Sequence, residues 1–181
     1  MEDVLLDLEC FIAKLNIRRL NVIGHSLGGL IALYYTIKHP EMIHKLVVVS
    51  AAANILIHPD FIKQLTTGCI DVPFLESGLA LSISNEYKQW IIDDLKKIKL
   101  PKEANDFMGV SSFNLRNIVH TIEHKTLVVV GEQDKVVSPR RSKDLAKALP
   151  NSTLALLPNA QHYPHLEEVE STAGHISRFL T

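Results

Sequence analysis

The chain has 181 residues, a length that suits one domain with room for a sizeable buried core. Nineteen Lys and Arg residues nearly balance twenty Asp and Glu residues, so the net charge of −1 argues against a nucleic-acid-binding surface. The longest apolar runs are too short to span a membrane, and the acidic start Met1-Glu2-Asp3 is unlike a secretory signal. The two cysteines have no paired spacing, which predicts free thiols and a cytoplasmic location.

Apolar segments with strand and helix periodicity alternate along most of the chain. Residues 1–16 predict an amphipathic helix whose apolar face carries Val4, Leu8, Phe11 and Leu15. The later elements expected in chain order are a strand at 20–24, a helix at 27–40 stopped by Pro40, strands at 45–51 and 125–131, a helix at 139–150, a strand at 152–158 and a helix at 165–180. Continuous apolar strands between helices predict an α/β fold with a parallel sheet covered on both faces.

Residues 54–118 interrupt this alternation with helix-like pieces, repeated Pro and Gly residues and no strong strand. We therefore expect a core made of residues 1–53 and 119–181, with 54–118 inserted over the sheet. The aromatic residues of the insertion either line an apolar pocket or form a small core of its own; they include Phe61, Phe74, Trp90 and Phe107.

One serine lies between two glycines where the strand at 20–24 meets the helix at 27–40, in the segment Gly24-His25-Ser26-Leu27-Gly28. A sharp strand-to-helix turn would expose Ser26 above the carboxyl edge of the sheet. Gly24 and Gly28 would remove side chains that collide in this turn, and the N–H of Leu27 would face a developing oxyanion at the helix N-terminus. This context predicts that Ser26 is a nucleophile and that Leu27 belongs to an oxyanion hole.

A serine nucleophile of this type needs an acid and then a histidine later in the chain. Asp134 follows the strand at 125–131, and His162 follows the strand at 152–158, so both are expected at the same sheet edge as Ser26. His165 lies three residues further on and competes for the role of the base. We expect His162 to contact Ser26 and Asp134, because His165 should already belong to the last helix.

These segments resemble the α/β-hydrolase superfamily, in its serine hydrolase branch with a helical cap. The matching pieces are "LNVIGHSLGG", "TLVVVGEQDKVVSP" and "LPNAQHYPHLEE". The resemblance implies that Ser26 is the nucleophile, Asp134 the triad acid and His162 the base, and that residues 54–118 are the cap. Gln161 stands where many relatives have a glycine before the histidine. Such a triad calls for no metal and no organic cofactor.

In that family, the helix that resembles residues 1–16 follows about half of the sheet, so we expect this sequence to be the C-terminal portion of an α/β-hydrolase. The loop that supplies a second oxyanion donor would then be missing. The strand at 20–24 would present an unpaired apolar edge. A second copy of the chain or another partner is therefore expected to cover this edge.

Two functions follow from these residues. The first is a serine hydrolase that cleaves a carboxylic ester or a related acyl bond of a small apolar substrate through an acyl-enzyme. Thioester, amide and C–C bond cleavage use the same triad and stay open. The alternative is a catalytically weak relative that acts as a binding or scaffold protein. The presence of all three triad residues favours the hydrolase.

Overall fold

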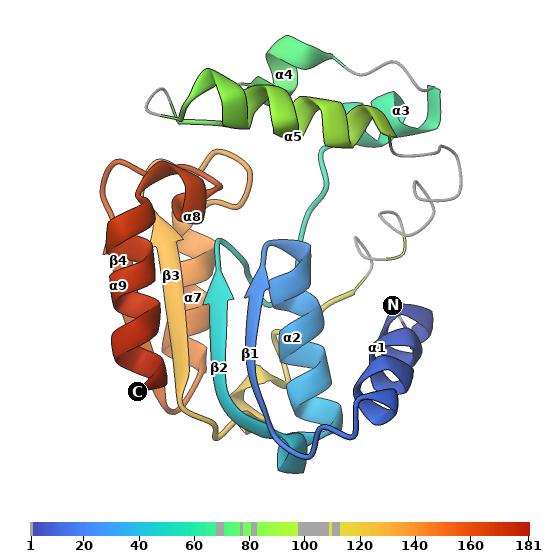
Figure 1. Cartoon of the computed structure of the whole chain (residues 1–181), viewed down its shortest axis with the longest axis vertical. Coiled ribbons are helices and arrows are strands. Elements are labelled where there is room, and N and C mark those ends of the chain that lie inside the picture. The colour runs from blue at the N-terminus through green and yellow to red at the C-terminus, as the bar shows by residue number, and fades with distance from the viewer. Residues whose placement is uncertain (1, 68–70, 77, 81–82, 98–108, 110–112) are drawn as a thin grey trace.

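The computed structural model describes residues 2–67, 71–76, 78–80, 83–97, 109 and 113–181. Its centre is a parallel four-stranded sheet whose spatial order equals the chain order (Figure 1). The strands are β1 (Leu20–His25), β2 (Ile43–Val49), β3 (Thr126–Gly131) and β4 (Ser152–Leu157). This confirms the predicted α/β class and all four expected strands, with β2 beginning and ending two residues earlier than the predicted 45–51.

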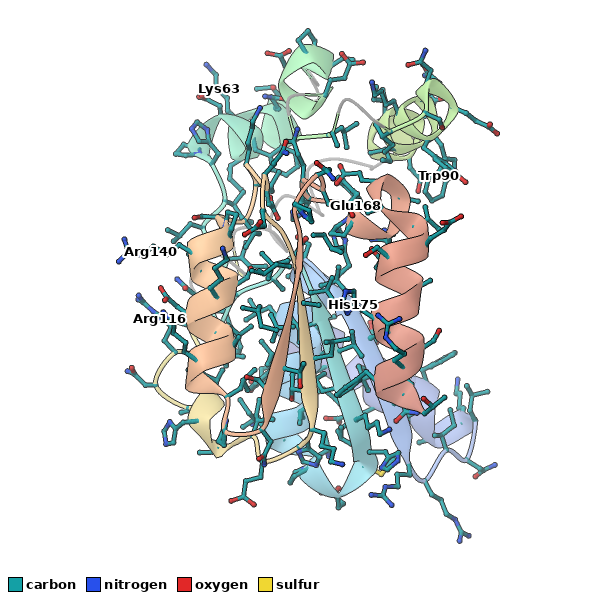
Figure 2. All side chains as sticks on the ribbon, turned by 90° about the vertical axis from the view of Figure 1, so that its left-hand side faces the viewer. Lys63, Trp90, Arg116, Arg140, Glu168 and His175 are labelled. Carbon is teal, nitrogen blue, oxygen red and sulfur yellow. The ribbon has the colours of Figure 1, made fainter. Side chains whose placement is uncertain are left out.

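Helices cover both faces of the sheet, as the continuous apolar strands predict. Helices α2 (Leu27–Lys38) and α7 (Pro139–Ala148) pack on one face, and α9 (Val169–Leu180) packs on the other (Figure 2). Consecutive valines of β2 point to opposite faces of the sheet: Val48 faces α2 and α7, whereas Val47 faces α9. Two 3-10 turns, η1 (Pro40–Met42) and η2 (Val119–Thr121), connect these elements.

Helix α1 (Glu2–Lys14) forms where it was predicted, but its buried face is different. The buried side chains are Leu5 and Ile12, which join the core beside α2. Of the four apolar residues expected on the buried face, Leu8 is partly buried and the others are exposed; these are Val4, Phe11 and Leu15. The predicted face of this helix is therefore wrong.

Polar contacts with α2 and with His39, the residue that follows it, explain which side of α1 is buried. The hydroxyl of Tyr34 donates a hydrogen bond to Glu2, and Nε2 of His39 donates to Oε1 of Glu9 at 2.7 Å. Glu2 and Glu9 are seven residues apart and therefore lie on the same side of the helix, next to the buried stripe. The sequence carries two apolar stripes on α1, and these pairings turn one of them toward the core.

The closing helix predicted at 165–180 is in fact two helices, α8 (Pro164–Glu167) and α9. Glu168 separates them, because its backbone leaves the helical region at φ −128° and ψ 64°. Its side chain turns back to the preceding loop, where Oε1 accepts a hydrogen bond from the N–H of Asn159 at 2.7 Å. The break places a short helix directly after the loop that carries His162.

Within the predicted insertion, the helices α3 (Pro59–Thr67), α4 (Val72–Glu76) and α5 (Asn85–Lys97) lie over the carboxyl edge of the sheet (Figure 1). Ile55 and Leu115, near the two ends of this segment, belong to the main core. A separate apolar cluster is formed by Leu79, Ile83, Ile91, Tyr163 and Leu166. Trp90 is 57% exposed on α5 and does not join this cluster. Phe107 and the side chain of Phe74 lie outside the described residues.

Two observations bear on the expectations from composition. Cys10 is a free, exposed thiol, and Cys69 lies outside the described residues. None of the helices that the structure describes combines the length and the apolar character needed to cross a membrane.

Candidate active site

Ser26 occupies a sharp turn between β1 and α2. Its backbone has φ 52° and ψ −118°, which lies outside the regions that residues with a side chain normally adopt. Backbone hydrogen bonds hold the turn. The N–H of Ser26 donates to the carbonyl of Val49 at 2.9 Å, and the N–H groups of Gly29 and Leu30 donate to the carbonyl of Ser26 at 3.0 and 3.3 Å. These bonds keep the serine at the carboxyl edge of the sheet, below the insertion.

Of the two glycines predicted to be needed in this turn, the structure supports Gly24 and not Gly28. A Cβ on Gly24 would lie 2.3 Å from the carbonyl oxygen of Gly28, so the need for glycine at position 24 is confirmed. A Cβ on Gly28 would meet no atom within 4 Å, and the predicted collision at this position is wrong. The second tight position is Gly29, whose Cβ would lie 2.6 Å from Cβ of Ala51. It is Gly29, rather than Gly28, that lets α2 approach the chain beyond β2.

The structure brings Ser26, Asp134 and His162 together. Nε2 of His162 lies 3.0 Å from Oγ of Ser26, and Nδ1 of His162 lies 3.0 Å from Oδ2 of Asp134. Since a carboxylate can only accept, Nδ1 carries the proton in this pair, and Nε2 is left free to accept the proton of the serine hydroxyl. His162 and Asp134 are 4% and 5% exposed, so water hardly competes for these contacts.

Asp134 is fixed by its own loop. Its Oδ1 atom accepts hydrogen bonds from the N–H groups of Val136 and Val137, at 2.8 and 2.9 Å. The other carboxylate oxygen is thereby directed at His162. This loop follows β3, so the carboxylate reaches the sheet edge at the place where the strand order predicts it.

His165, the competing histidine, belongs to α8. Its ring lies 4.8 Å from the ring of His25, measured between centroids. Burial and the nearby His162 lower its pKa. The histidine that lies within hydrogen-bonding distance of both Ser26 and Asp134 is His162, as the sequence predicts.

The N-terminus of α2 lies at the serine. Leu27 is the first residue of this helix, so its N–H has no acceptor within the helix and lies at the positive end of the helix dipole. A donor at this position can stabilise negative charge beside Ser26. In the described part of the chain, no three His, Cys, Asp or Glu side chains gather where they could hold a metal ion.

Sequence reasoning missed His25, the residue before the serine. Its Nε2–H donates to the carbonyl oxygen of His162 at 2.7 Å, which ties the serine turn to the histidine loop. Burial first, and then the nearby His162, lowers the pKa of His25 to about 4. His25 is therefore neutral near pH 7. Its place between Gly24 and Ser26 was the signal that could have revealed it.

A family model matches most of this chain. The model is described as serine aminopeptidase, S33, and it matches residues 1–169. Among curated proteins, the α/β-hydrolase domain-containing protein VTE7 of Arabidopsis thaliana is 30% identical over 178 residues, which cover 91% of this chain and 54% of the relative. A pimeloyl-[acyl-carrier protein] methyl ester esterase of Neisseria meningitidis is 23% identical, over 85% of this chain and 66% of that protein. The chain thus spans about half to two thirds of the length of these relatives.

Solved structures share the fold. A hydrolase from Pseudomonas aeruginosa PA01 matches with a TM-score of 0.86 and 21% identity, over 97% of this chain and 70% of that one. The enol-lactonase from Burkholderia xenovorans LB400 matches with a TM-score of 0.83 and 19% identity, over 99% of this chain and 72% of that one. At these identities the likeness concerns the fold.

Proposed function

Since the chain belongs to the serine aminopeptidase S33 family of the α/β-hydrolase superfamily, we propose that it is a serine hydrolase that cleaves a carboxylic ester or a related acyl bond. The observation that carries this proposal is the pair of 3.0 Å contacts that His162 makes with Ser26 and Asp134. A serine hydroxyl becomes a useful nucleophile only when a base in such a position can remove its proton.

In the first half of the reaction, Oγ of Ser26 attacks the acyl carbon while Nε2 of His162 takes the hydroxyl proton. The carboxylate of Asp134 holds the imidazole in the required tautomer and stabilises the positive charge that forms on it. The N–H of Leu27 donates to the oxyanion of the tetrahedral intermediate. The imidazolium then gives its proton to the leaving alcohol or amine, which departs and leaves an acyl-serine.

In the second half, a water molecule attacks the acyl-serine and His162 takes a proton from it. When the second tetrahedral intermediate collapses, His162 returns this proton to Oγ of Ser26, and the carboxylic acid leaves. The cycle ends with serine and neutral imidazole restored, so it needs no oxidant, reductant or co-reactant other than water.

We further propose that residues 54–118 form a cap that gives the site an apolar acyl pocket. The cluster of Leu79, Ile83 and Ile91 packs against Tyr163, which directly follows His162, and this supports an apolar substrate. The name of the Neisseria relative denotes an ester substrate, which supports an ester, whereas the description of the family model as an aminopeptidase keeps an amide open.

A fluorophosphonate probe tests the nucleophile directly. The parent protein should be labelled, and Ser26→Ala should lose the label together with ester hydrolysis, by on the order of 10⁴-fold or more. Ser50→Ala is a matched control, because Ser50 also has a positive φ, of 47°, and follows the neighbouring strand β2. Labelling that persists in Ser26→Ala would refute the assignment. A folded parent protein that is never labelled would favour a binding protein.

A further inference from the structure

The loop that carries His162 is clamped to the core at several backbone atoms. The end of β3 lies close to the backbone of this loop: a Cβ on Gly131 would be 2.1 Å from the carbonyl oxygen of Gln161. The side chain of His25 donates a hydrogen bond to the carbonyl oxygen of His162, and Oε2 of Glu167 accepts a hydrogen bond from the N–H of Gln161 at 2.6 Å. These contacts leave the backbone on either side of His162 with little freedom.

Two side chains of this loop and of α8 also reach the insertion. Nε2 of Gln161 donates to the carbonyl oxygen of Leu79 at 3.0 Å. Oε1 of Glu167 accepts the N–H of Ala80 at 2.9 Å, while its other oxygen holds Gln161. One carboxylate therefore bonds to the insertion and to the histidine loop at the same time.

The environment of these two side chains makes the links costly to break. Gln161 is 6% exposed, and burial raises the pKa of the Glu167 carboxyl even though backbone N–H groups bond to it. The apolar cluster of Leu79, Ile83, Ile91, Tyr163 and Leu166 belongs to the same contact. A broken link would leave a polar group without a partner in this surrounding, which is unfavourable.

Packing alone does not explain why glutamine occupies position 161. Its Oε1 atom is buried and has no hydrogen-bond partner among the described residues. An apolar side chain of similar length would avoid this unpaired acceptor. What the amide adds is the bond from Nε2 to Leu79, so the side chain is best explained by the connection to the insertion.

We propose that Gln161 and Glu167 are positioning residues that couple the insertion at Leu79 and Ala80 to the loop that carries His162. This inference rests on the proposed catalytic role of His162. A displacement of the segment at residues 79–80 is transmitted through the Glu167 carboxylate and the Gln161 amide to the backbone beside His162. Since a misplacement of about 1 Å can cost on the order of 10²-fold in rate, contacts made by a substrate with the insertion would change turnover as well as binding.

Hydrogen exchange combined with kinetics tests this coupling. In Gln161→Met, we expect the amide of Ala80 and the α8 amide of Leu166 to exchange on the order of threefold to tenfold faster, as the loss of one buried hydrogen bond implies. The value of kcat for ester hydrolysis should fall by a similar factor. Glu167→Gln, which retains one acceptor oxygen, should act in the same direction and combine non-additively with Gln161→Met.

The matched control is Gln89→Met on α5. Gln89 is also a glutamine of the insertion, but its Nε2 donates within its own helix, to Asp93 at 2.8 Å. The coupling is refuted if Gln161→Met changes exchange no more than Gln89→Met does, or if exchange rises while kcat stays at the parental value. If Gln161→Met fails to fold, Glu167→Gln provides the same comparison. Exchange requires no turnover, so an inactive parent protein would refute the proposed function while the coupling is still measured.

Discussion

Among single residues, His25 shows how burial changes the chemistry of a side chain beside the serine. The rings of His25 and His162 lie 4.8 Å apart between centroids. Burial first, and then the nearby His162, lowers the pKa of His25 to about 4. A second charged imidazole at this distance would oppose the imidazolium that the proposed mechanism forms on His162. The neutral form avoids that repulsion and still donates to the His162 carbonyl.

This shift predicts a pH dependence of stability. Between pH 6.5 and about 4, the unfolded chain binds a proton at His25 that the folded chain does not bind. Stability should therefore fall as the pH falls through this window and level off below about 4, with up to about 3 kcal/mol at stake. His25→Asn should flatten this part of the curve in urea denaturation, while the exposed His120→Asn should not. A His25→Asn curve as steep as that of the parent would contradict the prediction.

Among the helices and strands, the contact of α2 with the chain beyond β2 depends on one close approach. A Cβ on Gly29 would meet Cβ of Ala51 at 2.6 Å and Cγ1 of Val48 at 3.1 Å, whereas the space beside Gly28 is open. Two adjacent glycines of the same helix therefore have opposite packing environments. Alanine at either position gains the same helix propensity. The difference in stability between the two alanine variants therefore measures the effect of the contact at Gly29.

Alanine at these two positions should have opposite effects on the free energy of unfolding. Gly28→Ala should stabilise the protein by up to about 1 kcal/mol, since alanine is the better helix former. Gly29→Ala should destabilise it by about 1–3 kcal/mol, because the added methyl group overpacks the contact with Ala51. Thermal and urea denaturation measure both values. A Gly29→Ala variant as stable as Gly28→Ala would mean that this contact relaxes without cost.

At the scale of the molecule, β1 is an edge strand of the sheet that the described residues form. Among the described residues, this strand pairs with β2 on one side and is the last strand of the sheet on the other. Ile23 is 52% exposed there, because α9 packs over β3 and β4 rather than over β1. Unpaired backbone groups next to an exposed isoleucine form a surface that favours pairing with another chain.

We therefore expect this chain to associate through β1, with a second copy or with a partner. Ile23→Lys should weaken self-association measured by sedimentation, because a charged side chain opposes pairing at a strand edge. Leu156→Lys on β4, the opposite edge strand, is the control and should leave the association unchanged. A monodisperse parent monomer at micromolar concentration would contradict the expectation.

Local patterns in the amino-acid sequence suffice to predict the order of strands and helices and the three residues that meet at the sheet edge. Apolar periodicity is a local property, and parallel strands bring their carboxyl ends to one edge. Ser26, Asp134 and His162 each follow a strand, so the approximate position of each follows from the chain order alone. The α/β class and the meeting of these three side chains are therefore properties that the sequence alone predicts.

The contacts that surround these residues depend instead on how distant segments pack. His25 bonds to a residue 137 positions away, and Gln161 bonds to one 82 positions away. The buried face of α1 depends on the partners of Glu2 and Glu9 in and beside α2, and the role of Gly29 depends on Ala51. Such contacts form only when the tertiary structure brings the segments together, because local periodicity and motif spacing do not encode them.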